Sequence, residues 1–156
     1  MKRVERGEVL GLAEYETIRD RFRARVIEEK KARRVLLGEH ASCVFENHDT
    51  VLMQIQEMLR TERITREAAI QHEIDTYNEL IPTEHELSAT ILIEIPDKEP
   101  REKFLVEAKG LEREFALVVG GVRCAGKNDP SREHPERTTA VHYVKFDLAP
   151  DAEAAL

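Results

Sequence analysis

Residues 86–96 read ELSATILIEIP, the clearest secondary-structure signal in the chain. Successive residues of an extended chain point to opposite faces, so alternation separates this stretch into two sets of side chains. One face carries Leu87, Ala89, Ile91, Ile93 and Ile95, and the other carries Ser88, Thr90, Leu92 and Glu94. An apolar face opposite a more polar one predicts a strand of a largely antiparallel sheet.

Three further segments predict the remaining strands. Residues 33–47 (RRVLLGEHASCVFEN) contain two short strands around a turn at 38–40. Residues 114–126 predict a hairpin, because the Gly120–Gly121 pair supplies the positive φ angles of a tight turn. Residues 138–148 (TTAVHYVKFDL) predict the last strand.

Helical spacing of apolar residues predicts a first helix over residues 12–31. A second helix begins after Asn47 or Asp49, either of which can cap it. We expect Thr65 to cap the third helix and Pro82 to end it. The second and third helices therefore form an αα-hairpin.

Strands concentrated outside a helical hairpin indicate an α+β fold. We expect a single domain over residues 1–156, with a largely antiparallel sheet packed with the αα-hairpin and the N-terminal helix. A fourth helix is predicted at 100–109. The segment 126–137 (GKNDPSREHPER) has no apolar residue and is expected to be a flexible loop, and the tail 150–156 is expected to fray.

Composition points to a globular protein of the cytoplasm. The 156 residues are 41% hydrophobic and 35% charged, enough to bury a core without disulfides or metal. No apolar run approaches the roughly 20 residues of a membrane span, and the N-terminus lacks the apolar region of a signal peptide. Cys43 and Cys124 form no C-x-x-C arrangement, so neither a disulfide framework nor a cysteine zinc site is indicated.

The charge of the chain is unevenly distributed. A net charge of −7 argues against general binding of nucleic acid. Residues 19–34 hold eight basic and three acidic residues, so this stretch is +5 and the remainder is −12. The stretch predicts docking of an acidic partner, unless it is a solvated helix face with i,i+4 ion pairs. The predicted docking residues are Arg21, Arg25, Lys30 and Arg33.

The third helix carries two kinds of polar residue. His72, Asp75 and Glu79 share a face with a spacing that suits a hard metal ion, but this face lies opposite the apolar arc. We therefore expect it to face water and predict no metal site there. Glu73, beside Tyr77, falls inside the apolar arc, where a carboxylate must find a partner or take up a proton. It is either a paired structural residue or an acid–base or ligand-binding group.

Other polar residues border predicted core positions. Gln54 and Gln56 flank the apolar stripe of the second helix, so they and Glu73 are predicted to line one groove of the hairpin. His142 lies on the apolar face of the last strand, as a satisfied core histidine or as a ligand or base. Glu94, on the more polar face of its strand, is a further candidate partner for these groups.

Familiar cofactor and catalytic motifs are absent. The sequence has no glycine-rich dinucleotide motif, P-loop, G-x-S-x-G or H-E-x-x-H, and QHEIDTYNE lacks the second histidine of that last motif. A pair of E-x-x-H helices for a di-iron site is also missing. The sequence thus specifies no cofactor and leaves open whether the protein is an enzyme.

Four long stretches carry a resemblance to a known family: FENHDTVLMQIQEMLRTERI, DTYNELIP, ELSATILIEIP and AVHYVKFDL. In these the chain resembles the bacterial domain of unknown function family 3501, and the resemblance covers most of the chain. It implies no activity. Members are similar in often being encoded beside a rubrerythrin and a cysteine-rich iron–sulfur oxidoreductase, which implies an accessory role in peroxide or redox handling. The loop 126–137 lies outside these stretches, so a site is not expected there.

Two functions follow as hypotheses. The first is a cytoplasmic accessory or binding protein whose acidic partner is the iron–sulfur oxidoreductase or the rubrerythrin. The second is a small enzyme or metal-binding protein whose site combines Glu73, Tyr77 and His142 in a cleft by the helical hairpin. In that site Gln54, Gln56 or Glu94 are nearby ligand-binding residues. The sequence does not decide the oligomeric state.

Overall fold

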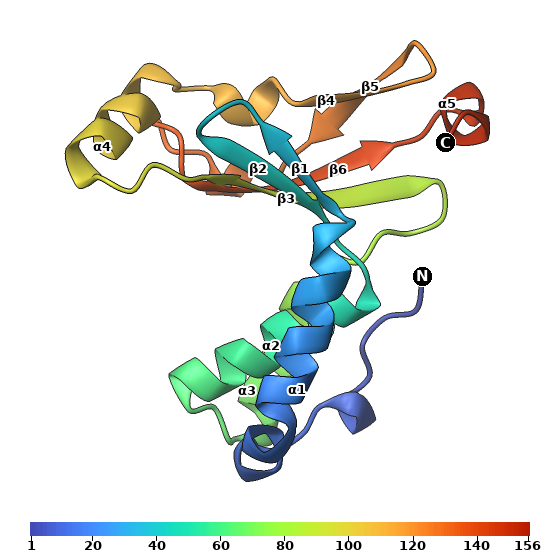
Figure 1. The fold of residues 1–156 in the computed structure, drawn as a ribbon, viewed down its shortest axis with the longest axis vertical. Coiled ribbons are helices and arrows are strands. Elements are labelled where there is room, and N and C mark those ends of the chain that lie inside the picture. The colour runs from blue at the N-terminus through green and yellow to red at the C-terminus, as the bar shows by residue number, and fades with distance from the viewer. The chain divides into compact units, whose positions relative to one another are not determined.

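The computed structural model describes residues 1–156 and has an α+β fold, as predicted. The chain forms two compact units. The helical unit comprises residues 1–33 and 46–82, and the sheet unit comprises residues 34–45 and 83–156. Figure 1 shows the helices and strands of both units. None of the helices combines the length and apolar character needed to span a membrane.

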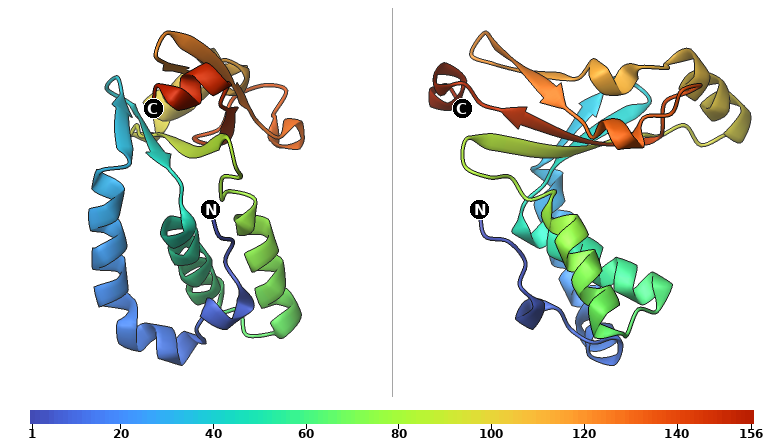
Figure 2. Two further views of the ribbon diagram at one scale, coloured as in Figure 1. Left: turned by 90° about the vertical axis from the view of Figure 1, so that its right-hand side faces the viewer. Right: turned by 180° about the vertical axis from the view of Figure 1, so that it is seen from behind.

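The helical unit contains three long helices and a short 3-10 turn. They are η1 (Arg6–Glu8), α1 (Leu12–Lys31), α2 (His48–Glu62) and α3 (Glu67–Asn78). The predicted first helix is confirmed, and α2 and α3 form the predicted αα-hairpin. Helix α2 packs against both α1 and α3, and Figure 2 shows the three lying side by side. The core between them includes Tyr15, Val26, Val51, Ile55, Leu59, Ile70 and Ile74.

The two hairpin helices begin differently. Asn47 caps α2, since its side chain accepts from the backbone N–H of Thr50 and its own N–H donates to the Thr50 hydroxyl, both at 2.9 Å. The predicted Thr65 cap of α3 is wrong. The chain leaves α2 through Arg63 in the left-handed conformation and stays non-helical through Arg66, which offers no side-chain cap. Helix α3 therefore begins two residues after Thr65.

Two side-chain amides fasten the N-terminal segment to the hairpin. Val4 N–H donates to Asn78 Oδ1 at 2.8 Å, and Asn78 Nδ2 donates to the Val4 carbonyl at 2.9 Å. Leu10 N–H donates to Gln56 Oε1 at 2.7 Å, and Gln56 Nε2 donates to the Leu10 carbonyl at 3.2 Å. Each amide thus satisfies a backbone donor and a backbone acceptor, as a neighbouring strand would.

The sheet unit contains one six-stranded antiparallel sheet with the order β1-β2-β3-β6-β5-β4. Its strands are β1 (Arg34–Leu37), β2 (Ala41–Phe45), β3 (Glu86–Ile93), β4 (Ala116–Val119), β5 (Val122–Lys127) and β6 (Val141–Asp147). Its helical segments are α4 (Lys98–Glu107), η2 (Leu111–Arg113), η3 (Pro130–Arg132) and α5 (Pro150–Ala154). Helix α4 begins two residues before its predicted start, so Pro100 lies in the first turn, where it removes no helical hydrogen bond.

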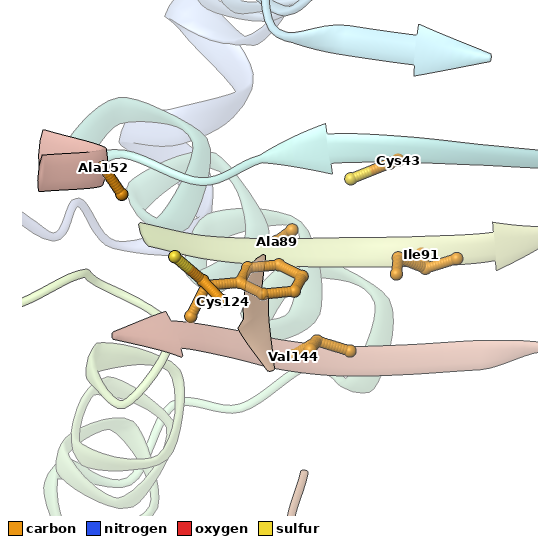
Figure 3. Packing of buried hydrophobic residues seen from close by; sticks show 7 residues of the cluster. Cys43, Ala89, Ile91, Cys124, Val144 and Ala152 are labelled. Atoms are coloured by element: carbon orange, nitrogen blue, oxygen red, sulfur yellow. The ribbon is translucent and has the colours of Figure 1, made fainter. Parts of the chain in front are cut away.

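The predicted alternation of β3 places its apolar face in the core. Ala89 lies opposite Val144 of β6 and Phe45 of β2, and Ile91 lies opposite His142 and Cys43. Figure 3 shows the buried cluster on this face, in which Cys124 of β5 and Ala152 of α5 join Cys43, Ala89, Ile91 and Val144. Both cysteines are free and buried.

Two features shape the β4–β5 hairpin. Gly120 and Gly121 have φ angles of 56° and 82°, which confirms the predicted tight turn. At Gly126 a Cβ atom would lie 2.6 Å from Val144 Cγ1, so only glycine allows β5 to approach β6 this closely. The tail 150–156, for which the sequence predicts fraying, contains α5, which packs against both strands of the hairpin.

Candidate functional site

A small polar cleft, with an interior volume of about 30 Å³, lies in the sheet unit where β6 begins. Its inner wall is formed by Glu112 of η2, by Thr138 in the segment just before β6, and by His142 of β6. The rim comes from the loop 126–137, which contains η3, and from Tyr143. The loop 126–137, in which no site was expected because it lies outside the stretches that resemble the family, thus forms one side of this cleft.

The three inner residues form a hydrogen-bonded chain. The Thr138 hydroxyl donates to Glu112 Oε2 at 2.8 Å and lies 3.3 Å from His142 Nε2. All three residues are buried. Two further contacts fix the chain: Thr138 N–H donates to the Leu105 carbonyl at 2.9 Å, and the Phe115 ring meets the His142 ring edge-on with centroids 5.3 Å apart. A carboxylate, a hydroxyl and an imidazole are therefore held in one fixed arrangement.

The pKa values of Glu112 and His142 differ from those of free side chains in water. Burial lowers the pKa of His142, and a backbone hydrogen bond at Thr139 and the Glu112 charge oppose this shift only in part. Burial alone raises the pKa of Glu112, but hydrogen bonds from its own backbone N–H and from Thr138, with the charges of His142 and Arg113, leave that pKa below its usual value. At neutral pH the cleft thus holds an ionised carboxylate and a neutral imidazole.

This arrangement suits binding and proton transfer better than nucleophilic attack. Thr138 is 1% exposed and its hydroxyl already donates to Glu112, so it serves to position the groups on either side. His142 and Glu112 line the cleft and can exchange hydrogen bonds or a proton with a small polar molecule.

Charged and aromatic side chains line the rim. The Arg132 guanidinium carbon lies 4.9 Å from the centroid of the Tyr143 ring, a cation–π contact. Asn128 Nδ2 donates to Glu133 Oε1 at 3.2 Å. Asp129 caps η3 through the backbone N–H of Ser131 at 3.0 Å. The loop is thus tied by its own polar contacts beside the cleft.

The predicted docking helix carries a second surface of interest. Ile18 and Phe22 line a shallow groove on α1 together with Arg21 and Arg25. These residues follow the i, i+3, i+4, i+7 spacing of one helix face. Arg21 is exposed and makes no ion pair, whereas Arg25 lies 5.4 Å from the Phe22 centroid. We call these four residues the α1 groove.

Most other basic residues near α1 are paired within the helical unit. Arg25 Nη1 lies 2.9 Å from Asp49 Oδ2, and Arg33 donates to the Glu46 backbone carbonyl at 3.3 Å. Arg19 binds Glu57 through two nitrogens, at 2.8 and 3.0 Å. Lys30 is half-buried. Of the four predicted docking residues, Arg21 is therefore the one most open to a partner.

The third helix largely follows the expectation from its sequence. His72, Asp75 and Glu79 are exposed, and Glu73 and Tyr77 are half-buried. Within the described chain no group of three or more histidine, cysteine or acidic side chains is arranged to hold a metal ion. Glu73 and Tyr77 belong to the helical unit and His142 to the sheet unit, so their predicted convergence stays a prediction.

The predicted ligand-binding residues have varied surroundings. Gln54 is half-buried, while the Gln56 amide is already occupied by the backbone of Leu10. Glu94 is exposed, with an oxygen 3.9 Å from Arg34 Nη1. Gln56 is therefore less free to bind a ligand than its place beside the apolar stripe suggests.

One charged cluster was not anticipated from the sequence. His48 Nε2 lies 2.9 Å from Glu8 Oε1, and His48 Nδ1 lies 3.1 Å from Asp49 Oδ1. Burial lowers the pKa of His48, but hydrogen bonds and charges from Asp49 and Glu8 outweigh burial and raise it above its usual value. The His48 ring thus links the N-terminal segment to the start of α2.

The comparisons with known proteins identify a family. A family model described as "Protein of unknown function (DUF3501)" matches residues 3–156. The chain belongs to this family. A crystal structure from Burkholderia pseudomallei K96243, described as a novel protein of unknown function, is similar with a TM-score of 0.90 and 34% identity, over 99% of this chain and 81% of that chain. No curated protein matches the chain.

Sequence reasoning about this DUF3501 chain found His142 but missed its neighbours. Glu112 lies in a three-residue 3-10 segment and Thr138 lies before β6, so neither has periodic neighbours that would reveal its burial. The one available signal was the composition of residues 138–142, where two threonines precede a histidine on an apolar face. The sequence did not predict the contact of the Asn78 amide with the Val4 backbone either.

Proposed function

We propose that the protein is an accessory binding protein of the cytoplasm that docks an acidic partner of an iron–sulfur and rubrerythrin redox system. One observation supports this function best: the α1 groove, in which Ile18 and Phe22 lie beside Arg21 and Arg25. Apolar side chains with guanidinium groups beside them suit an acidic amphipathic segment, because the apolar contacts add affinity and the charges set orientation. The genomic neighbourhood implied by the family resemblance supplies the identity of the partner.

Arg21→Glu tests this function. We expect tagged protein in extracts of the native host at low salt to recover the iron–sulfur oxidoreductase or the rubrerythrin. Arg21→Glu should reduce recovery about tenfold, the factor that 1.4 kcal/mol of like-charge repulsion gives. Recovery should also fall with added salt, because exposed charges are screened.

Arg66→Glu is the matched control. Arg66 is an exposed arginine of the same unit that lies outside α1, and its reversal changes the net charge equally. We expect it to leave recovery unchanged apart from a small effect of net charge. Recovery of neither redox protein by the unaltered chain, or equal losses with both variants, would contradict the proposal.

The cleft supports a second candidate function, the binding or acid–base conversion of a small polar molecule. The observation that favours it is the buried pair of an ionised Glu112 and a neutral His142 joined through Thr138. Paired groups whose pKa values are displaced in this way are typical of functional sites. This function requires that Glu112 control the pKa of His142, which can be measured directly.

A further inference from the structure

Strand β1 is an apolar edge of the sheet. It pairs with β2 on one side only and stands last in the strand order. All four of its residues, Arg34–Leu37, are exposed. Val35, Leu36 and Leu37 are 47%, 74% and 41% exposed. An exposed apolar edge strand presents free backbone donors and acceptors, so it is a ready template for a further strand.

The opposite edge of the same sheet is treated differently. Helix α5 packs against β4 and β5 at that edge. Ala155 lies so close to Gly120 that a Cβ atom added to Gly120 would be 2.6 Å from the Ala155 Cβ. Within the sheet unit, only its neighbour β2 makes extensive contact with β1. The contrast singles out β1 as the edge left for an external strand.

The sequence of β1 is complementary to itself. In a dimer with a twofold axis normal to the sheet, the odd-numbered residues of both β1 strands point to the same face. An odd-numbered residue can therefore lie opposite only another odd-numbered residue, and an even-numbered one opposite only another even-numbered one. The register that sets Leu36 against Leu36 of a second copy also sets Val35 against Leu37, twice. All three exposed apolar residues then face apolar residues. The neighbouring register sets Leu36 against Arg34 and lacks this match.

The charges at the two ends of β1 fit the same register. Arg34 begins the strand and Glu39 lies two residues beyond its end, with a side chain that is 91% exposed. In the antiparallel pair Arg34 of each copy lies opposite Gly38 of the other, one residue from Glu39. The basic start of each strand therefore lies near the acidic turn of the other, whereas an in-register parallel pairing would set Arg34 beside Arg34.

We propose that β1 is a self-association strand, through which two copies of this chain form an antiparallel β1–β1 dimer centred on Leu36. The partner is a second copy because this register pairs every exposed apolar residue of β1 with another, and because the antiparallel direction brings the basic start of each strand near the acidic turn of the other. This surface belongs to the sheet unit and is separate from the α1 groove, so the dimer can stand or fall independently of the docking function.

Sedimentation velocity tests the dimer. A four-residue strand pair is a small interface, so measurements should span about 5 to 500 µM. We expect reversible dimerisation in the unaltered chain. Leu36→Lys should raise the dissociation constant at least tenfold, because it opposes two lysines at the axis. Amide exchange within residues 34–37 should slow as the protein concentration rises.

Two controls keep the interpretation specific. Val118→Lys alters another exposed apolar strand residue, 64% exposed, at the other edge and should leave the dimer intact. Arg34→Glu and Glu39→Arg should each weaken the dimer, and the double variant should restore it at least partly. A monomer at every concentration, or a dimer that Leu36→Lys leaves unchanged, would overturn the proposal and leave β1 to another partner.

Discussion

His142 is held neutral by its surroundings, and the resulting pKa can be measured by NMR. We expect the His142 pKa to lie below its usual value of about 6.5, because burial disfavours the imidazolium. Glu112→Gln should lower that pKa further, since the Glu112 charge stabilises the protonated ring. Glu136→Gln, at an exposed position outside the cleft, is the control and should have no effect.

The same displacement sets the sign of a stability effect. The folded-state pKa of His142 lies below its unfolded-state value, so the unfolded chain takes up the proton first as the pH falls. The contribution of His142 to the free energy of unfolding is therefore fully present above about pH 6.5. It is lost as the pH falls from there toward the folded-state pKa of His142. His48 acts in the opposite direction, because its raised pKa favours the folded state at low pH. A His142 pKa at or above 6.5, or a His142 pKa that is the same in the Glu112→Gln variant, would remove the basis of the second candidate function.

The N-terminal segment and the αα-hairpin depend on the two amides that join them. Asn78→Leu should destabilise the protein by about 2 kcal/mol in urea unfolding, because it leaves the N–H and C=O of Val4 unpaired. Gln56→Leu should cost about 1 kcal/mol, since the half-buried Leu10 can turn to water. Both variants should expose residues 1–11 to proteolysis.

A third amide on the same hairpin provides the control. Gln71 is exposed on α3 and donates only to Asp75, at 2.8 Å, so Gln71→Leu should change stability by less than about 0.5 kcal/mol. Equal effects of all three substitutions would show that the amides do not act by holding the N-terminal backbone.

At the level of elements, the periodic spacing of apolar residues predicted the helices and strands that have a regular buried face. Alternation placed β3 and the buried side of β6, helical spacing placed α1, and Gly120–Gly121 placed a turn. Contacts between residues distant in sequence leave no such pattern. The bond from Thr138 to Glu112 joins positions 26 residues apart, and that from Val4 to Asn78 spans 74. The candidate site was therefore predicted through His142 alone, and the use of Gln56 as a backbone clamp was not foreseen.

The order of strands constrains the whole chain. The β1–β2 hairpin, residues 34–45, is separated from the rest of the sheet unit by residues 46–82 of the helical unit, yet β2 pairs with β3 in the middle of the sheet. A fragment of residues 83–156 lacks β2, so it leaves the apolar edge of β3 unpaired and removes Cys43 and Phe45 from the core. We expect this fragment to aggregate or to lack dispersed amide resonances in NMR spectra.

A fused chain distinguishes the missing strand from a general effect of truncation. Phe45 lies opposite Ala89, so the end of β2 is next to the start of β3. Joining residues 34–45 to residues 83–156 through about six Gly/Ser residues should close a β2–β3 hairpin. The fusion should give dispersed spectra and a strand-rich circular dichroism signal. If residues 83–156 fold equally well alone, the central pairing of β2 with β3 is dispensable, and the inserted helical unit places no demand on how the sheet forms.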